Sequence, residues 1–304
     1  MSKSNNGHIA IVAHDAGAAA QIFAWLESGL LNIDMCSFCL EGPAAKSFQT
    51  QQPKVKLSSL EAVLIGSEKL ISGTGWSSSL EHNARMLAKK NSIKSIAVID
   101  HWVNYKARFI RDHKEVLPDI IWVSDKYAYS KAKRCFPKIE IVEQKNDYIK
   151  AQVDEVLSYK IDRKKGEINI LYVLEPIRDA WAGSEVEGEF QALDFFFKSI
   201  PNLNLGEDLS IILKPHPSDP KDKYDHWVRS SDFPDIYIEK EKDLASMLAW
   251  SDVVVGCETY AMVLALAANK RVISSLPRYA HNCRLPYKNI ERLNQMNEAK
   301  YEVL

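Results

Sequence analysis

The sequence has no hydrophobic run of membrane-spanning length, no excess of charge of either sign and no even set of cysteines. None of its apolar stretches approaches the roughly 18 residues of a membrane helix, and residues 1–7 are polar, without the hydrophobic core of a signal peptide. We therefore expect a cytoplasmic protein, with a peripheral position at the inner face of the membrane as the alternative. The 39 basic and 40 acidic residues nearly cancel, which argues against a general nucleic-acid binder and favours a small-molecule ligand. The five cysteines are odd in number, as expected for reduced thiols.

Several familiar chemical motifs are missing as well. The chain has no Asp-x-Asp pair to hold a metal ion, no P-loop lysine motif and no serine nucleophile elbow. Its loop at residues 13–20, AHDAGAAA, is not a G-x-G-x-x-G motif, so we infer no dinucleotide. The sequence accordingly predicts neither a metal ion nor a cofactor. Positive charge at a site would have to come from side chains and helix N-termini.

Length and pattern predict two domains. A chain of 304 residues is long for one core and suits two domains of about 150 residues each. In the first half, β-rich runs alternate with amphipathic patterns, and strands are predicted at residues 9–13, 35–40, 69–72, 95–99, 120–124 and 139–142. One helical pattern places Leu80, Ala84 and Leu87 on one face, preceded by Ser78 and Glu81 in a capping-box arrangement. Strands that alternate with helices indicate a doubly wound parallel sheet.

The same alternation restarts after a charged segment, residues 158–166, that is typical of a linker. Strands are predicted at 168–174, 209–213, 236–238, 253–255 and 272–274, with helices at 185–200, 243–250 and 259–269. The expected fold class is therefore α/β, with two Rossmann-like, doubly wound parallel-sheet domains at residues 1–160 and 167–286. A cleft between two such domains is the expected ligand site. The remaining tail, residues 287–304, is polar and helical in character.

Two strand ends in the second domain carry groups suited to phosphate. Lys214 and His216, in the sequence Lys-Pro-His-Pro, follow the apolar run 209–213, at the end of the strand where open α/β sheets bind ligands. The strand at 252–255 runs into GCETY, residues 256–260, and then into an apolar helix whose free N–H groups would face the same crevice. Together they predict a phosphate and nucleotide site. The alternative is a plain turn in which His216 satisfies backbone groups.

These motifs resemble the donor domain of glycosyltransferases with two Rossmann-like halves, the GT-B architecture. The His-Pro motif is closest to that of bacterial sialyl and polysialyl transferases, capsule Kdo transferases and CDP-glycerol transferases. The resemblance implies a metal-independent glycosyltransferase of surface glycan or polysaccharide biosynthesis. Its donor would be a nucleotide-activated sugar such as a CMP-sugar, and its acceptor a glycan or a lipid-linked molecule. The tail at 287–304 would then cross back onto the first domain, or form a surface helix.

The resemblance also implies roles for the 256–260 loop. Glu258 would hold ribose or sugar hydroxyls and Thr259 would contact phosphate, although Glu258 could instead cap its own helix. Arg178 follows the first strand of this domain and is a candidate phosphate or carboxylate clamp, or else the partner of Asp179 in a surface ion pair. From the residues themselves, His216 could donate to a phosphate or sugar oxygen of the donor, and Lys214 would supply positive charge for the departing phosphate.

Candidate catalytic residues follow the strands of the first domain. His14 and Asp15 come after the opening strand, and Gly17 in the same loop would let a substrate approach the backbone closely. Asp15 is the first choice as the general base that takes a proton from an acceptor hydroxyl. Capping of the next helix is the alternative role of Asp15.

Two further strand ends in this domain offer chemistry. Gly75 and Trp76 lie in a glycine-punctuated loop suited to anion or sugar contact. Asp100 and His101 end the next strand and compete with Asp15 for the base role, and the aromatic face of Trp102 would suit a sugar ring. The same three residues could instead stabilise a loop.

Two other functions fit the same features. A sugar-nucleotide epimerase of this architecture would need carboxylates on both sides of the bound sugar, which Asp15, Asp100 and Glu258 could supply. A non-catalytic sugar-nucleotide-binding protein would need no base. A homo-oligomer is compatible with either function.

Overall fold

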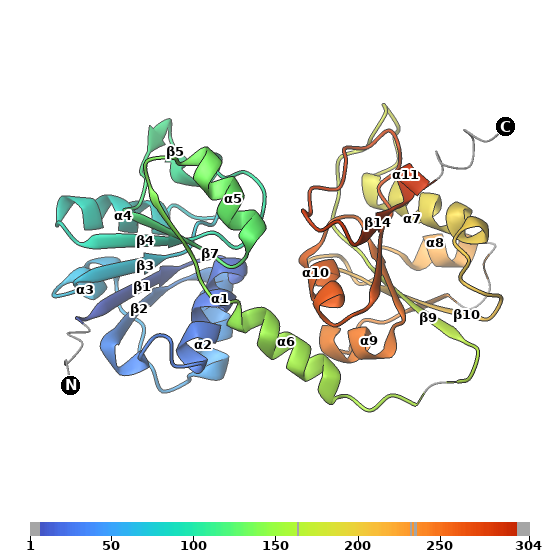
Figure 1. Ribbon diagram of the computed structural model, residues 1–304, viewed down its shortest axis with the longest axis horizontal. Coiled ribbons are helices and arrows are strands. Elements are labelled where there is room, and N and C mark those ends of the chain that lie inside the picture. Colours follow the sequence, from blue (N-terminus) through green and yellow to red (C-terminus); the bar gives the residue numbers. More distant parts are fainter. Residues whose placement is uncertain (1–6, 163, 232, 234–235, 297–304) are drawn as a thin grey trace. The chain divides into compact units, whose positions relative to one another are not determined.

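The computed structural model describes residues 7–162, 164–231, 233 and 236–296 (Figure 1). The chain forms two compact units, Met1–Lys150 and Ala151–Leu304, and each contains a parallel six-stranded sheet. The division falls inside helix α6 (Asp147–Ser158), ahead of the charged segment 158–166, of which residue 163 lies outside the described residues. The predicted α/β fold with two Rossmann-like parallel sheets is confirmed.

The first sheet has the strand order β2-β1-β3-β4-β7-β8. Its strands are β1 (Ile9–Ala13), β2 (Cys36–Leu40), β3 (Lys69–Ser72), β4 (Lys94–Val98), β7 (Ile120–Val123) and β8 (Glu140–Glu143). Successive side chains of β1 point to opposite faces. Ile11 packs with α1 (Ala16–Glu27) and α2 (Gly42–Gln51), whereas Val12 packs with α3 (Leu60–Leu64) and α4 (Leu80–Lys90). Because helices cover both faces, β1 is apolar at every position.

The second sheet has the order β11-β10-β9-β12-β13-β14. Its strands are β9 (Ile168–Val173), β10 (Leu209–Lys214), β11 (Ile236–Ile238), β12 (Val253–Gly256), β13 (Arg271–Ser274) and β14 (Ile290–Arg292), and its helices include α7 (Gly188–Ser199), α8 (Asp225–Ser230), α9 (Leu244–Trp250) and α10 (Tyr260–Ala267). One core combines aliphatic with aromatic side chains, and in it Tyr172 packs against Phe196 of α7. The buried Tyr172 hydroxyl lies 2.7 Å from Ser275 Oγ, so this phenol has the partner it needs.

Every predicted strand is present, with ends shifted by at most one residue. The sequence did not reveal the short hairpin of β5 (Ile110–Arg111) and β6 (Lys114–Glu115). Its turn places Asp112 and His113 at φ +47° and +60°, a conformation that aspartate tolerates better than most residues. Strands of two residues leave no periodicity to detect.

The tail differs from its prediction at residues 290–292. They form β14, which pairs in parallel with β13. Among the described residues of the tail, only Leu293–Met296 (α11) are helical. Ile290 is buried, and Glu291 accepts two hydrogen bonds from Arg271 of β13, both 2.8 Å long. This tertiary pairing outweighs the local helical tendency. Residues 297–304 lie outside the described residues, so a helix that crosses back stays a prediction.

Each sheet reverses its strand order at one point. The chain passes from β1 to β2 and returns on the other side of β1 as β3, and in the same way it passes from β9 through β10 and β11 and returns beside β9 as β12. Ligands of open α/β sheets bind at the carboxyl ends of the strands next to such a reversal. A ligand site is therefore expected at the loops after β1, β3, β9 and β12.

Candidate functional site

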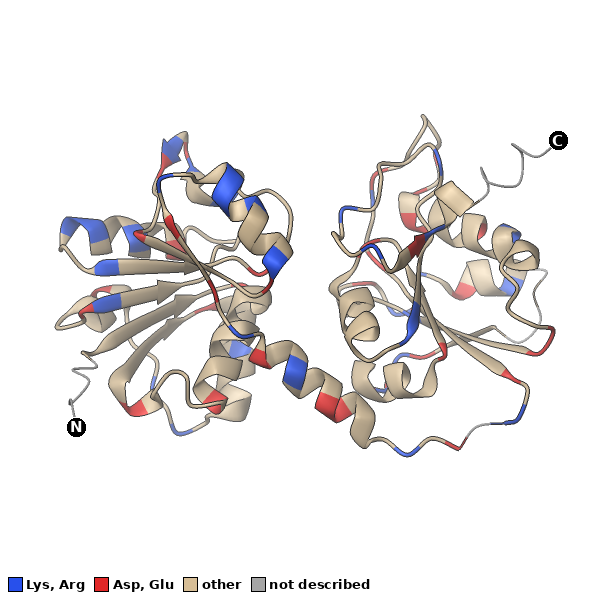
Figure 2. Ribbon diagram, viewed as in Figure 1, with Lys and Arg blue, Asp and Glu red and all other residues tan. Residues whose placement is uncertain are grey.

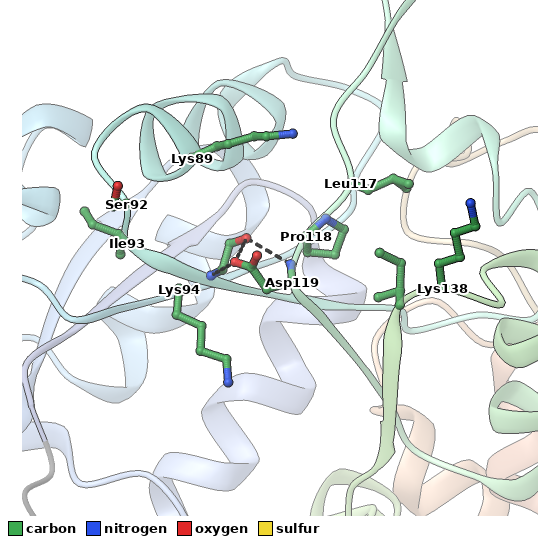
Figure 3. Close-up of a pocket in the computed structure, with 10 residues that line it drawn as sticks. Lys89, Ser92, Ile93, Lys94, Leu117, Pro118, Asp119 and Lys138 are labelled. Atoms are coloured by element: carbon green, nitrogen blue, oxygen red, sulfur yellow. Dashed lines mark hydrogen bonds between the residues drawn. The ribbon is translucent and has the colours of Figure 1, made fainter.

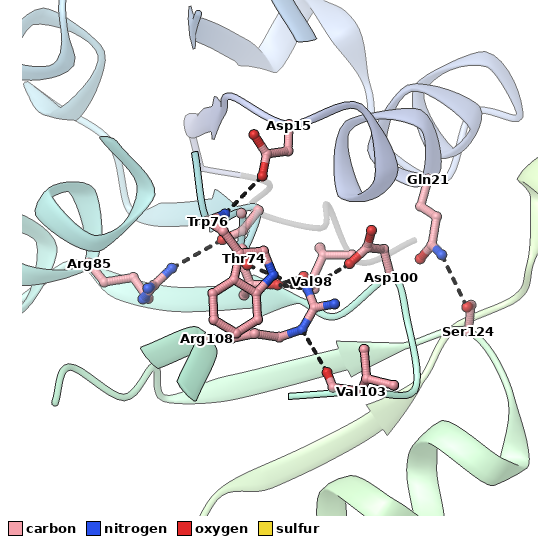
Figure 4. A network of polar contacts seen from close by, with 12 residues as sticks. Asp15, Gln21, Thr74, Trp76, Arg85, Val98, Asp100, Val103, Arg108 and Ser124 are labelled. Atoms are coloured by element: carbon pink, nitrogen blue, oxygen red, sulfur yellow. Dashed lines mark hydrogen bonds and ion pairs between the residues drawn. The ribbon is translucent and has the colours of Figure 1, made fainter. Parts of the chain in front are cut away.

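His14 and Asp15 form a hydrogen-bonded pair at the end of β1. His14 Nδ1 lies 2.7 Å from Asp15 Oδ1. The other carboxylate oxygen, Asp15 Oδ2, accepts the Trp76 amide at 2.8 Å (Figure 4). Burial by itself would raise the pKa of Asp15, but hydrogen bonds from His14, the Trp76 amide and Ser77 outweigh burial and lower that pKa. Asp15 is therefore ionised at neutral pH and can only accept. It follows that His14 Nδ1 carries a proton, and that Nε2 is the acceptor of the neutral ring.

The Asp15 carboxylate connects two loops rather than capping a helix. Asp15 occupies the N-cap position of α1, but its side chain makes no capping hydrogen bond to that helix. It reaches instead to the loop after β3, which lies on the other side of the strand-order reversal. The carboxylate thus fixes the His14 imidazole and the Trp76 backbone together.

Gly17 and Gly75 make room for the protein's own carboxylates. A Cβ atom on Gly17 would overlap Asp100 Oδ2, and one on Gly75 would overlap Asp15 Oδ2. The absence of side chains here is required by internal packing. A close approach of a substrate to these two loops stays a prediction.

Asp100 is paired with a buried arginine. Arg108 is 5% exposed, and its Nη1 donates to Asp100 Oδ1 at 2.7 Å and to Thr74 Oγ1 at 3.0 Å (Figure 4). This ion pair would have to be released before that oxygen could accept a substrate proton. His101 lies beside Asp100, with its ring centroid 5.2 Å from that of Trp102.

The exposed aromatic face at this edge belongs to Trp76. Trp102, expected to offer a surface to a sugar, is 4% exposed and donates its indole N–H to Asp125 at 2.9 Å. That expectation is wrong, because the loop after β4 folds its tryptophan inward. Trp76 is 44% exposed, with the guanidinium groups of Arg108 and Arg111 at 5.9 and 6.0 Å from its ring centroid.

Sequence reasoning did not identify two buried charged residues of α4 as part of this edge. Glu81, 2% exposed, accepts the His14 amide at 3.0 Å, and Arg85, 1% exposed, donates to the Gly73 carbonyl at 3.0 Å. The capping-box interpretation of Glu81 is corrected: Ser78 Oγ accepts the Leu80 amide, but the Glu81 carboxylate turns to the loop after β1. A Glu and an Arg four residues apart beside the buried Ala84 were the signal available in the sequence.

In the second unit, His216 is exposed in the turn after β10. Its Nδ1 accepts the Ser218 amide at 3.2 Å and lies 2.8 Å from Ser218 Oγ, so the neutral ring carries its proton on Nε2 and can donate from there. The backbone-satisfying role considered for His216 therefore applies to Nδ1. A buried ionic group holds the turn: the Asp219 amide donates to the His216 carbonyl at 2.9 Å, and Lys223 pairs with both Asp219 and Glu189.

The two candidate cations of this unit differ in how they are held. Lys214 is half-buried and donates its ammonium group to the Lys242 carbonyl. Arg178 is exposed, and no described residue forms an ion pair with it. The surface ion pair considered between Arg178 and Asp179 is thus not formed, and Arg178 is open to an anionic ligand.

A carboxylate of the chain occupies the amides that were expected to be free. Glu175 follows β9, and its Oε1 accepts the amides of Cys257 and Glu258 at 3.1 and 2.7 Å. Burial raises the pKa of Glu175 to about 7, and the nearby Glu258 charge acts in the same direction against the amide hydrogen bonds. The expectation of free N–H groups here is corrected in part: the Glu175 carboxyl group takes the amides of Cys257 and Glu258, which precede α10, and Thr259 caps the Ala261 amide of the helix itself.

Glu258 and Thr259 take different roles in the same loop. Thr259 Oγ1 caps α10 by accepting the Ala261 amide at 3.4 Å. The Glu258 carboxylate does not cap this helix; it accepts the Arg284 amide and side chain, and His281 Nε2 at 2.9 Å. Burial would raise the pKa of Glu258, but these partners, Arg284 above all, lower it. A ligand hydroxyl would have to share a carboxylate that already has several donors.

A cavity of about 710 Å³ opens at the opposite edge of the first sheet (Figure 3). It is lined at the amino ends of β4, β7 and β8 by residues that include Lys89, Lys94, Asp119 and Lys138. The Asp119 carboxylate is engaged by the amide and hydroxyl of Ser95. The cavity is thus remote from the carboxyl ends of the strands, where the candidate groups lie.

Charge and metal-binding groups are dispersed. Figure 2 shows lysine and arginine on α4 and α5 (Lys126–Cys135) and acidic residues over both units. In the described part of the chain, no three His, Cys, Asp or Glu side chains are grouped so that they could hold a metal ion. None of the described helices has the length and apolar character that crossing a membrane requires.

No protein-family model and no curated protein sequence matches the chain. Among solved structures, UDP-GlcNAc 2-epimerase from Neisseria meningitidis bound to UDP-GlcNAc is similar with a TM-score of 0.60 at 10% identity, covering 88% of this chain and 82% of that one. MurG from Acinetobacter baumannii is similar with a TM-score of 0.50 at 11% identity, covering 97% and 91%. Both likenesses extend over the two sheets and, at such identity, establish the fold. The chain therefore has the GT-B-type fold of two Rossmann-like units that its sequence predicted.

Proposed function

We propose that this protein is a glycosyltransferase that uses a nucleotide-activated sugar, with a CMP-sugar as the leading candidate, in surface glycan or polysaccharide biosynthesis. The observation that carries the proposal is the His14–Asp15 pair, a 2.7 Å hydrogen bond at a strand-order reversal of a fold shared with a UDP-GlcNAc 2-epimerase that is bound to its nucleotide sugar. The acceptor would be a glycan or a lipid-linked molecule. The reaction would take place in the cytoplasm or at the inner face of the membrane.

In this proposal the first unit activates the acceptor. The ionised Asp15 holds His14 with Nδ1 protonated, so Nε2 takes the proton of the acceptor hydroxyl while its oxygen bonds to the anomeric carbon. Sequence reasoning chose Asp15 itself as the base. Its lowered pKa and its hydrogen bond to His14 favour an orienting role instead, as an aspartate orients histidine in hydrolase triads. The 44% exposed ring of Trp76, whose amide is bound to the same carboxylate, supplies a face for the acceptor sugar.

The second unit would hold the donor in this proposal. As the bond from the anomeric carbon to the phosphate oxygen breaks, negative charge develops on the departing nucleotide. His216 Nε2–H, Lys214 and the exposed Arg178 would stabilise that charge without a metal ion. Glu258, ionised and held by Arg284, would orient a hydroxyl of the ribose or sugar.

Product analysis tests the proposal. The purified protein is incubated with CMP-, CDP-, UDP- and GDP-sugars, each with and without a panel of glycan and lipid-linked acceptors. A glycosyltransferase releases nucleotide and forms an extended glycan only when an acceptor is present. Binding of a donor without turnover across the panel would favour a non-catalytic binding protein.

An epimerase is the second candidate, because the UDP-GlcNAc 2-epimerase from Neisseria meningitidis has this fold over 88% of the chain. The buried carboxyl group of Glu175, whose pKa burial raises to about 7, would offer an acid that holds a proton near neutral pH. The pKa of Glu81 is raised as well. An epimerase would isomerise the donor in the absence of any acceptor. The same incubations therefore separate the two functions.

A further inference from the structure

A buried carboxyl group lies directly behind the His14–Asp15 pair. Glu81 Oε1 accepts the His14 backbone amide at 3.0 Å from a helix 67 positions further along the chain, and the side chain is only 2% exposed. Its Oε2 is buried, and no described residue forms a hydrogen bond with it. The Gly73 backbone closes the space, since a Cβ atom there would lie 2.6 Å from Glu81 Oε1.

The Glu81 carboxyl group does not cap the helix to which Glu81 belongs. Glu81 lies in the first turn of α4, where a carboxylate ordinarily faces the helix amides, but its carboxyl group turns to the loop after β1 instead. Arg85, one turn on, donates its N–H groups to Ser72 Oγ and to the carbonyls of Gly73 and Val116. A fully ionised carboxylate with one unbonded buried oxygen is costly, and a neutral carboxyl group is much less so.

Burial of Glu81 favours its neutral form and outweighs the groups that oppose it. Burial raises the pKa of Glu81 and the charge of Asp15 raises it further, while the His14 amide, Arg85 and the His14 imidazole act in the opposite direction. The pKa of Asp15, in contrast, is lowered by its hydrogen bonds. Asp15 and Glu81 are thus neighbouring carboxyl groups whose environments shift their pKa values in opposite directions. In enzymes, such a pair commonly divides the ionised and the protonated role between its two members.

We propose that Glu81 is a positioning residue of the His14–Asp15 pair, which holds the His14 backbone and keeps its proton to a higher pH than Asp15, so that on rising pH the charge of Asp15 faces the imidazole first. Its role in the reaction rests on the proposed function, whereas the division of protons between Glu81 and Asp15 does not. The proposal can therefore be tested with and without a substrate.

The amide protons of His14 and Trp76 report the two carboxyl groups separately, because each donates to a different one. In the ¹⁵N-labelled full-length protein, the His14 amide resonance should titrate with a midpoint above the 4.5 usual for glutamate. The Trp76 amide should titrate below the 3.8 usual for aspartate. Glu81→Gln, which keeps an oxygen for the His14 amide, should abolish the first transition and leave the second.

Glu61→Gln is the matched control, since Glu61 is an exposed first-turn glutamate of α3, and it should leave both transitions in place. The proposal is overturned if the wild-type His14 amide titrates at or below pH 4.5, or if its transition survives in Glu81→Gln. Neither readout needs a donor or an acceptor. Failure of the glycosyltransferase assignment would leave this result intact.

Where turnover is measurable, two variants separate the two effects of Glu81, which are its hydrogen bond to the His14 amide and its titration. Glu81→Leu, which offers the His14 amide no acceptor, should lower kcat about tenfold or more relative to Glu81→Gln, with little change in KM, because a misplaced catalytic group costs rate rather than binding. Glu81→Gln should remove the step in the pH profile of kcat that coincides with the His14 amide transition. Equal kcat values in the two variants, or an unchanged profile, would exclude the positioning role.

Discussion

In both units, a carboxylate at the end of the first strand binds backbone amides of the loop across the strand-order reversal. Asp15 accepts the Trp76 amide in the first unit, and Glu175 accepts the amides of Cys257 and Glu258 in the second. Their environments differ, because Asp15 also has a histidine partner that lowers its pKa, while burial raises the pKa of Glu175 to about 7. The same position thus provides a fixed anion in one unit and a group that titrates near neutrality in the other.

Asp15→Asn should reduce turnover by roughly a hundredfold or more while donor affinity stays nearly unchanged. The neutral amide introduced by this substitution would no longer stabilise the protonated Nδ1 of His14, which the ionised carboxylate does. Single-turnover kinetics and donor calorimetry measure the two effects. Asp100→Asn is the comparison: it breaks the ion pair with Arg108 and should mainly cost stability. If Asp100→Asn abolishes turnover and Asp15→Asn retains it, the two roles must be exchanged.

His216→Ala should weaken nucleotide binding by about tenfold to a hundredfold without unfolding the protein, since it removes one hydrogen bond to a charged group, which is worth about 1.5–3 kcal/mol. The side chain is exposed, and its partner Ser218 lies in the same turn, so the fold loses little. Isothermal calorimetry with the nucleotide measures the affinity, and His226→Ala, at an exposed position of α8, serves as control. Equal affinities for wild type and His216→Ala would remove the donor-site assignment.

Glu175→Gln should make stability less dependent on pH. The folded-state pKa of Glu175 is raised from 4.5 to about 7, mainly by burial, so the folded state binds this proton more tightly than the unfolded chain does. The resulting stabilisation is complete below pH 4.5 and is lost as the pH rises through 7, by on the order of 3 kcal/mol at most. Urea midpoints at pH 5 and 7.5 should therefore fall further in the wild type than in the variant. Equal decreases of the urea midpoint in the wild type and in Glu175→Gln would contradict the raised pKa of Glu175.

At the scale of elements, the loops after β1, β3 and β4 form one interlocked structure. The Asp100 side chain fills the space beside Gly17 at the start of α1, and Arg108 of the loop after β4 holds Asp100 in place. Arg111 of the β5–β6 hairpin donates to the Gly75 carbonyl at 2.7 Å. The short hairpin thus supports the loop that bears Trp76, which gives it a role beyond connecting strands.

Gly17→Ala should destabilise the protein by about 1–3 kcal/mol, because the new Cβ would overlap an Asp100 carboxylate that its ion pair prevents from moving. The direction of the stability change is informative, since replacing an exposed helix glycine by alanine ordinarily stabilises a protein by about 1 kcal/mol. Urea denaturation measures the difference. A stability equal to or above that of the wild type would show that Asp100 is free to move.

At the scale of the whole molecule, each unit has its own six-stranded sheet and hydrophobic core. The candidate base lies in the first unit and the candidate donor groups in the second. The groups proposed to stabilise the donor phosphate are side chains of the chain itself: the cations Lys214 and Arg178, and His216, which donates from Nε2. This is the physical basis for expecting catalysis without a metal ion.

Turnover should therefore persist in excess EDTA, at the rate measured without chelator. Phosphate charge would be neutralised by side chains that a chelator does not remove. The measurement is nucleotide release over a range of EDTA concentrations, with added magnesium or manganese as the comparison. Complete loss of turnover with EDTA, restored by either ion, would demonstrate a metal requirement.

The local pattern of this sequence determined most of its elements. Strands buried on both faces are short, continuous apolar runs, and the amphipathic helices between them have a different period, so periodicity alone located every strand except the short polar hairpin and β14. Because parallel strands end at one edge, the sequence also placed His14, Asp15, Lys214 and His216 at the carboxyl edges of their sheets.

Only the tertiary structure decided which groups meet at those edges. Three contacts join residues whose spacing in the sequence gives no sign that they meet. They are Glu81 with the His14 amide, Arg108 with Asp100, and Glu175 with the amides after β12. Tertiary packing also determined that Trp102 turns inward and that residues 290–292 form a strand. A side chain's partner depends on strand order and on the space left by neighbouring glycines, whereas periodicity reports only which face of an element is buried.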